Sequence, residues 1–202
     1  MYYLVFLSTF SLTSLACAAV NYYFPHYRVK EEEDRIITGD YLKMLPTVSL
    51  NLLLAYPAFK GAELYINSKE PSEINPVLFF PIWLLVADLT FYSIHRIMHR
   101  PYFYKKYHYI HHQFRYTYGM GAIYAHPYEF LLGNIFPTFS PLLIFTPTNG
   151  VVYFIIIFAT SFTVIVSHGG YKMFDDSHLK HHLLFRKNYG LFISDKIMGT
   201  SY

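Results

Sequence analysis

The chain alternates between long apolar stretches and short polar segments. Five apolar stretches run over about residues 2–20, 44–62, 76–94, 130–146 and 151–166. Each is close to the ~20 residues that a helix needs to cross a bilayer. Pro137 and Pro141 interrupt the fourth stretch, whereas the fifth is nearly continuous. The turn sequence at 147–150, Pro-Thr-Asn-Gly, predicts that the last two stretches form a hairpin.

The composition supports a membrane protein. The 202 residues are 53% hydrophobic and only 14% charged, whereas soluble domains are roughly 25% charged. We therefore predict an all-α integral membrane protein, one domain over residues 1–202, with about four to five membrane-embedded helices. Cys17 is the only cysteine, which excludes an internal disulfide and a cysteine-held iron–sulfur cluster.

The first apolar stretch has two interpretations. Residues 1–20 could be a cleaved signal peptide, since the small residues Ala16 and Ala18 flank Cys17 at a plausible cleavage site. The segment has no basic region before its apolar part. That absence favours an uncleaved N-terminal anchor helix.

The basic residues are distributed unequally between the two sides of the predicted membrane. Of the 16 lysines and arginines, all except Lys60 and Lys69 fall in the three polar segments that alternate onto one side. An excess of lysine and arginine marks cytosolic segments. We therefore expect this side to be cytosolic, with a helical cap that carries the histidines. The net charge of +3 is small, and no nucleic-acid partner is expected.

Histidines dominate the chemistry of this side. Ten of the 11 lie between residues 95 and 182: His95, His99, His108, His111, His112, His126, His168, His178, His181 and His182. Spacings of three and four place imidazoles on one helical face. Neutral imidazole is a ligand for Zn, Fe, Cu and Ni alike, so the residues alone leave the metal open. Eight to ten imidazoles exceed what one ion of four to six ligands uses, so two ions are expected.

Two polar residues precede the first histidine pair within a predicted span. Asp88 and Tyr92 lie seven and three residues before His95, on roughly the same helical face. Either could accept the outer N–H of a ligating imidazole and fix its orientation. The alternative for Asp88 is a structural carboxylate paired with an arginine.

The three histidine clusters read HxxxH at 95–99 and HxxHH at 108–112 and 178–182. Spread over membrane segments, this pattern resembles the fatty acid hydroxylase / sterol desaturase superfamily, the membrane histidine-box di-iron oxygenases. Residues 88–96, 125–129 (Ala-His-Pro-Tyr-Glu), 167–171 (Ser-His-Gly-Gly-Tyr), 188–190 and 195–200 resemble further motifs of the family. The resemblance covers about residues 80–200. It looks nearest to the C-4 methylsterol oxidase and cholesterol 25-hydroxylase branch.

The resemblance implies a function. The protein would use dioxygen and external electrons to hydroxylate or desaturate a C–H bond of a lipid in the endoplasmic reticulum membrane, with a sterol as the expected substrate. Two iron ions, replaceable by zinc in purified protein, would be bound by the clustered histidines, with His168 and His126 as further ligands. Asn188 would hold a metal-bound water. A small b-type cytochrome and its reductase would supply the electrons.

Two departures from the family pattern stand out. Ser194 occupies a position at which the family usually has tryptophan, and Lys172 occupies one at which some members have another histidine. Three alternatives remain open. The first is the same chemistry on a fatty acyl or sphingoid chain. The second is a zinc-dependent membrane hydrolase, for which Glu129 is the nearby candidate base. The third is an inactive metal-binding scaffold.

Overall fold

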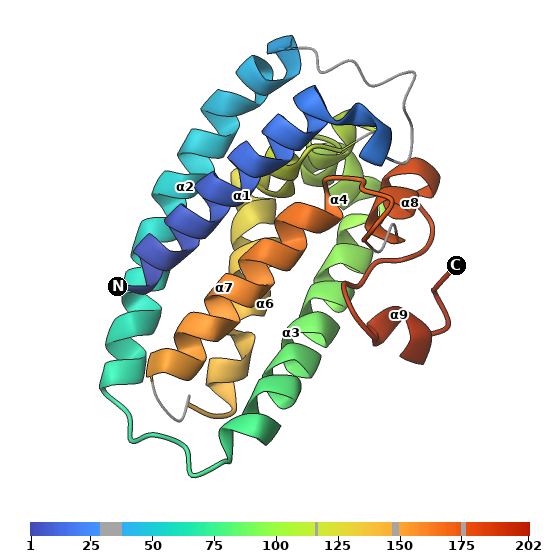
Figure 1. Cartoon of the computed structure of the whole chain (residues 1–202). Helices are drawn as coiled ribbons and strands as arrows, with labels where there is room; N and C mark the ends of the chain where they lie inside the picture. The colour runs from blue at the N-terminus through green and yellow to red at the C-terminus, as the bar shows by residue number, and fades with distance from the viewer. Residues whose placement is uncertain (29–37, 116, 147–149, 175–176) are drawn as a thin grey trace.

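Long apolar helices form the body of the protein. The computed structural model describes residues 1–28, 38–115, 117–146, 150–174 and 177–202. The long helices are α1 (Tyr2–Tyr23), α2 (Thr38–Asn67), α3 (Pro76–Met98) and α7 (Gly150–Ser167). They lie side by side in one bundle (Figure 1). The described residues contain no β-strand, which confirms the predicted all-α membrane fold.

Three of the five predicted spans are confirmed as single helices long enough to cross a bilayer. The spanning candidates are Tyr2–Tyr23, Gly39–Asn67 and Val77–Met98, and Val152–Ser167 is a shorter apolar helix. Local sequence explains the start of α3, because the Asn75 side chain accepts a hydrogen bond from the Val77 N–H and Pro76 occupies the first turn. The second span is longer than predicted, because its helix continues to Asn67.

The apolar stretch at 130–146 is interrupted, as Pro137 and Pro141 predict, and it does not form one long helix. This region consists of consecutive short turns: η5, a π-helix (Phe130–Ile135), α6 (Phe136–Phe139) and η6, a 3₁₀-helix (Ser140–Leu143). Proline lacks an N–H and its ring collides with the preceding turn. Pro137 and Pro141 therefore stand near the starts of α6 and η6, where no such hydrogen bond is lost.

Aromatic rings pack the interior of the bundle. The Tyr2 ring meets the Tyr153 ring edge-on, with centroids 4.4 Å apart, and thereby joins α1 to α7. The Phe6 ring of α1 stacks on Phe59 of α2 at 4.9 Å. The long helices are thus fixed against one another through apolar contacts.

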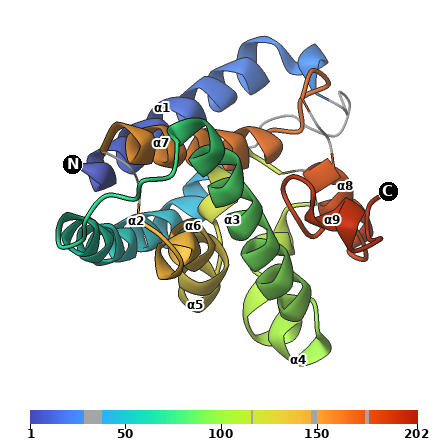
Figure 2. The ribbon, with the colours of Figure 1, turned by 90° about the horizontal axis from the view of Figure 1, so that it is seen from below.

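Short elements form a cap at one end of the bundle. They are η1 (Pro25–Tyr27), α4 (Pro101–Phe103), the π-helix η2 (Tyr104–His108), η3 (His111–Gln113), η4 (Gly119–Ile123), α5 (Pro127–Glu129), α8 (Ser177–Leu184) and α9 (Ser194–Ile197). In both ribbon views α8 and α9 lie beside α3 and far from α2 (Figure 2). The cap therefore gathers at the C-terminal end of α3.

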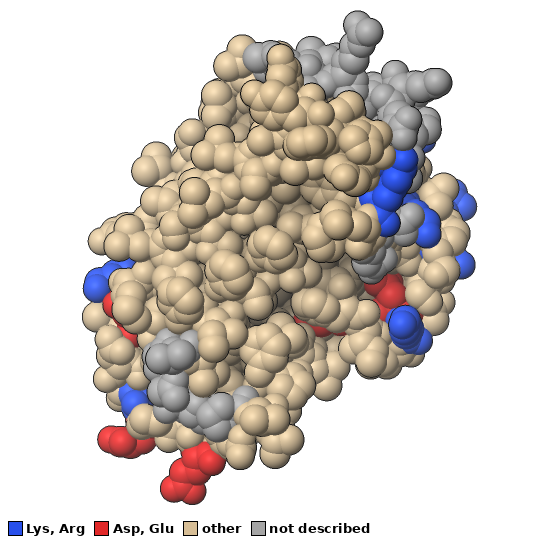
Figure 3. Space-filling model, in the orientation of Figure 1, with Lys and Arg blue, Asp and Glu red and all other residues tan. Residues whose placement is uncertain are grey.

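The charge distribution of the surface fits a membrane-embedded body. Most of the face viewed in Figure 3 carries no charged residue, and lysine and arginine gather beside the cap. At the other end Lys60 approaches Glu63 at 3.8 Å, and Glu63 also pairs with the N-terminal amine. An apolar band between two charged ends is typical of a protein that crosses a bilayer.

Candidate metal centre

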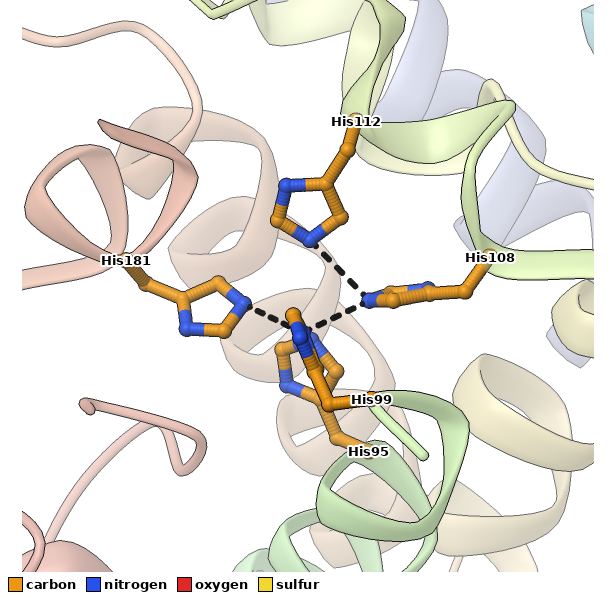
Figure 4. A group of neighbouring side chains, drawn as sticks. All are labelled: His95, His99, His108, His112 and His181. Carbon is orange, nitrogen blue, oxygen red and sulfur yellow. Dashed lines mark hydrogen bonds between the residues drawn. The ribbon is translucent and has the colours of Figure 1, made fainter. Parts of the chain in front are cut away.

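Nine of the ten clustered histidines meet at the cap in two groups. The first group consists of His95, His99, His108, His112 and His181, and the second of His111, His168, His178 and His182. Within each group, one nitrogen of every residue lies within 4.8 Å of the others. Figure 4 shows the first group, with imidazoles from α3, η2, η3 and α8 pointing at one another.

Helical spacing explains how the histidines divide. Residues four apart share a face, so His108 and His112 enter the first group together while His178 and His182 enter the second. The intervening histidine of each HxxHH motif points elsewhere: His111 joins the second group and His181 the first. Each motif therefore supplies ligands to both groups.

The outer nitrogens of five imidazoles are held by oxygen acceptors. The Nδ1 atoms contact oxygens of other residues at these distances: His95 to Tyr189 O, 2.7 Å; His108 to Glu129 Oε1, 2.6 Å; His111 to Tyr124 O, 3.3 Å; His168 to Val164 O, 2.7 Å; and His181 to Lys187 O, 2.7 Å. A carbonyl oxygen can only accept a hydrogen bond, so Nδ1 carries the proton where it faces one. In a neutral ring, Nε2 then presents a lone pair.

These inner nitrogens face one another closely. His168 Nε2 lies 3.3 Å from His111 Nε2, and both rings have Nδ1 directed at a carbonyl. Their two lone pairs therefore oppose each other and cannot form a hydrogen bond. In the first group, His99 Nε2 lies 2.9 Å from both His108 Nε2 and His181 Nε2.

A bound cation resolves this repulsion. Two nitrogens that each lie about 2.1 Å from one ion, at roughly right angles, are about 3 Å apart. The observed separations of 2.9 to 3.3 Å match this geometry. His95 Nε2 and His182 Nε2 are buried and have no hydrogen-bond partner among the described residues. The donor set therefore fits two metal ions with nitrogen ligands.

Burial keeps these side chains neutral. It lowers the pKa of His108 and His181 to about 3 and the pKa of His111 to about 4. Protonated imidazole has no free lone pair, so the depressed pKa values preserve the ligands at neutral pH.

Glu129 lies behind one of the clustered imidazoles. It was a candidate base for a hydrolase, but its carboxylate lies on the Nδ1 side of His108, which is the side away from the converging Nε2 atoms. Burial raises the pKa of Glu129 to about 7, because the buried carboxylate loses its hydration. The Ala-His-Pro-Tyr-Glu motif was the feature of the sequence that could have indicated this position for Glu129.

His126 does not reach either metal group. Its Nδ1 accepts a hydrogen bond from the Tyr128 N–H at 3.3 Å and so caps α5. Its ring packs against those of Tyr107 and Tyr128, with centroid distances of 5.0 and 5.5 Å. The expectation of a metal ligand at this position is therefore not supported, because the proline that follows begins a helix that turns the ring outward.

Asp88 is buried, but it does not contact an imidazole. Its two carboxylate oxygens accept four backbone N–H groups: those of Leu191 at 2.8 Å, Phe192 at 3.2 Å, Ile193 at 2.9 Å and Ser194 at 2.8 Å. The expected direct bond to a ligand histidine is wrong, and so is the alternative arginine partner among the described residues. Asp88 instead fixes residues 191–194 against α3.

Asp195 also binds this backbone segment and connects it to His95. Its carboxylate accepts the N–H groups of Tyr189 and Gly190 at 2.8 and 2.6 Å, and the Tyr189 carbonyl faces His95 Nδ1. A Cβ atom on Gly190 would collide with Ser194 Oγ, so only glycine fits this close approach. Asp88 and Asp195 thus orient His95 through the backbone of residues 189–194, a contact that no sequence spacing indicated.

Tyr92 and Asn188 also have structural partners. The Tyr92 hydroxyl accepts a hydrogen bond from Arg96 at 2.7 Å and lies 3.1 Å from Thr200 Oγ1. The Asn188 amide donates to Ser177 O and accepts from the Tyr202 N–H, at 3.0 and 2.9 Å. The prediction of an Asn188-bound water is not supported, because both ends of this amide are used by the backbone.

An apolar chamber adjoins the histidines. Six phenylalanines line it: Phe6, Phe10, Phe59, Phe91, Phe130 and Phe192. A smaller pocket lies against five of the histidines and Glu129. Five residues line both spaces, which are therefore neighbours: Phe91, Ala122, Asn134, Val164 and Leu191. An apolar ligand in this chamber would lie beside the two histidine groups.

Comparison with known proteins gives a consistent family. The family model described as fatty acid hydroxylase matches residues 80–200. The chain is 32% identical over 126 residues to human "Fatty acid hydroxylase domain-containing protein 2", which covers 59% of the chain and 37% of that protein. It is 34% identical over 119 residues to "Methylsterol monooxygenase 1-2" of Arabidopsis thaliana, covering 59% and 39%.

The similarity to a third relative extends over nearly the whole chain. "Delta(7)-sterol 5(6)-desaturase erg3B" of Aspergillus fumigatus is 28% identical over 214 residues, covering 98% of the chain and 62% of that protein. The chain thus spans between about a third and two thirds of the length of these relatives. No solved structure matches it.

Proposed function

Because the chain belongs to the fatty acid hydroxylase family, we propose that it is a membrane-bound di-iron oxygenase that hydroxylates or desaturates a sterol. The observation that carries the proposal is the pair of histidine groups beside an apolar chamber. Relatives named as methylsterol monooxygenase and sterol desaturase support a sterol substrate.

Two irons would be held by the nine histidines of the two groups. When bound, they would supply the activation of dioxygen. In hydroxylation, one C–H bond, one dioxygen, two electrons and two protons give one C–OH bond and one water. In desaturation, two hydrogens leave the substrate and two waters form. The ligands of the site are imidazoles, which do not supply electrons to the reaction. The two electrons would therefore come from an external electron donor.

The residues around the centre orient ligands and exclude water. Glu129 and backbone carbonyls hold the outer nitrogens of the imidazoles, which fixes the direction of each lone pair. The phenylalanine-lined chamber holds the lipid so that its carbon skeleton is kept from water.

The electron donor and the location belong to the same proposal. A small b-type cytochrome with its reductase would dock on the cap, where Arg96, Arg100, Lys105 and Lys106 are close in sequence to the ligands. A basic surface steers an acidic partner by long-range attraction. The membrane would be that of the endoplasmic reticulum, with the cap in the cytosol, as the distribution of basic residues indicates.

The same chemistry on an acyl or sphingoid chain is the second candidate, since the chamber is apolar throughout most of its wall. A hydrolase is disfavoured because Glu129 Oε1 contacts Nδ1 of His108, on the side of the ring away from the converging Nε2 atom. An inactive scaffold would bind metal and lack turnover.

Metal analysis combined with lipid analysis tests the proposal. Protein purified from iron-supplemented cells should contain about two iron ions per chain, as the two donor groups require. Membranes with the protein, reductant and a methylated sterol should form an oxidised sterol under air and none without dioxygen. Two irons without any lipid oxidation would favour the scaffold. Two zinc ions that resist replacement by iron would refute the oxygenase.

A further inference from the structure

Asn134 occupies the junction between the apolar chamber and the histidine pocket. Among the five residues that line both spaces, it is the only one with a polar side chain. It belongs to the π-helix η5, five residues after Glu129, which holds His108. A polar group at this point meets any ligand that extends from the chamber to the histidines.

The orientation of its amide is fixed by the backbone. The Asn134 Nδ2 donates a hydrogen bond to Ala122 O at 3.1 Å, and a carbonyl oxygen can only accept. The nitrogen therefore faces Ala122 and the oxygen faces away from it. Within the part of the chain that the structure describes, Asn134 Oδ1 receives no hydrogen bond. The side chain is only half-buried.

An apolar ligand that fills the chamber would shield this oxygen from water, and an amide oxygen is then costly to leave without a donor. Most other polar groups of the chamber are already used: Thr138 donates to Asn134 O, Thr160 donates to Ile156 O, and Asp88 accepts four N–H groups. Ser161 on α7 also lines the chamber, but it does not line the histidine pocket. Only Asn134 combines a free acceptor with that position.

We propose that Asn134 Oδ1 is a positioning group that accepts a hydrogen bond from a hydroxyl of the bound lipid. An acceptor recognises an alcohol and does not recognise a ketone or an ester oxygen, which have no proton to donate. This inference rests on the proposed function in one respect: it places the hydroxyl beside the metal groups, so the carbon that is oxidised lies near the substrate's own hydroxyl. A lipid oxidised in the middle of an unsubstituted chain would leave Asn134 unpaired.

Equilibrium binding to the purified protein tests the proposal without turnover. The probes are cholesterol and the analogue that lacks its hydroxyl, and octadecanol with octadecane as the acyl-chain pair. Wild-type protein should bind the alcohol of at least one pair about 5- to 10-fold more tightly than the matching hydrocarbon, the ratio for one net hydrogen bond. Preference within the sterol pair supports a sterol source, and preference within the octadecyl pair alone supports an acyl source.

Asn134→Leu should abolish the preference for the alcohol and leave binding of the hydrocarbon unchanged, which shows that the chamber is intact. Asn134→Ala serves as a second variant if the leucine variant does not fold. Ser161→Ala is the matched control in the same chamber and should keep the preference. The proposal is overturned if Asn134→Leu keeps the preference, if Ser161→Ala loses it instead, or if wild-type protein shows none. Absence of oxygenase activity with an intact binding preference would contradict only the proposed function.

Discussion

Replacing Asp88 by asparagine should loosen the strap of residues 189–194 and weaken metal binding without removing a ligand. Each carboxylate oxygen of Asp88 accepts two backbone N–H groups. The asparagine amide keeps one acceptor oxygen and places an NH₂ group where the other oxygen was. Two N–H groups, for example those of Ile193 and Ser194, then lose their acceptor and face a donor.

The magnitude follows from these two groups. A buried N–H left without an acceptor costs about 1–3 kcal/mol, so Asp88→Asn should lower the free energy of unfolding by roughly 2–6 kcal/mol, provided that the strap stays in place. If the strap opens instead, the Tyr189 carbonyl leaves His95 Nδ1 and the first histidine group loses its orientation. Loss of an outer partner of a ligand typically weakens metal binding about 10- to 100-fold.

The assay is equilibrium unfolding in mixed detergent micelles, combined with metal content by elemental analysis. Asp40→Asn is the matched control, since Asp40 accepts one hydrogen bond from the Tyr118 hydroxyl and an amide oxygen can replace it. That variant should lie within about 0.5 kcal/mol of wild type. An Asp88→Asn protein with unchanged unfolding and unchanged metal content would show that the strap is not held by this carboxylate.

Three further predictions concern the metal, pH and topology. His111→Ala or His181→Ala should lower the metal content and abolish turnover, measured by elemental analysis and lipid analysis. His126→Ala should retain both, because His126 caps α5 outside the two groups. Equal loss in all three variants would contradict the ligand assignment. The metal-free protein should lose stability, measured by thermal unfolding, as pH falls from about 6.5 towards 4. The histidines of the unfolded chain bind protons in this range, whereas burial holds the pKa of His111 in the folded protein at about 4. A stability that does not change with pH would show that these rings are solvated. A glycosylation tag after Tyr202 should stay unmodified in microsomes, because the basic segments are expected in the cytosol. Glycosylation of this tag would contradict the predicted topology.

Local patterns were sufficient for the long helices and for gathering most of the histidines as candidate ligands. Helical spacing within each motif predicted that His95 and His99 lie together, and the same holds for His108 and His112. The grouping of His111 with His168 depends on the position of α7 relative to η3, which no spacing contains. The sequence therefore led us to expect two metal ions, and helical spacing accounts for the pairs within each motif, but the spacing does not show which pairs from different motifs meet.

The polar residues near the ligands were harder to assign. Asp88 stood on the correct helical face, but its partners are backbone N–H groups more than 100 residues later in the chain. Backbone donors leave no sequence signature, because every residue except proline carries one. The same reason explains why the carbonyls of Tyr189 and Lys187 could not be identified as the groups that orient His95 and His181.

The crossing of His111 and His181 between the two groups has a consequence for biosynthesis. Neither metal group can be completed before α8 is synthesised, because α8 supplies ligands to both. The first group has four members before α7, whereas the second has only His111 there. An ion bound by either group would also restrain η3 and α8, which carry members of both groups, so partially loaded chains should be scarce. In the cell, the metal supply during translation would then limit how much of the newly made protein becomes fully loaded with metal.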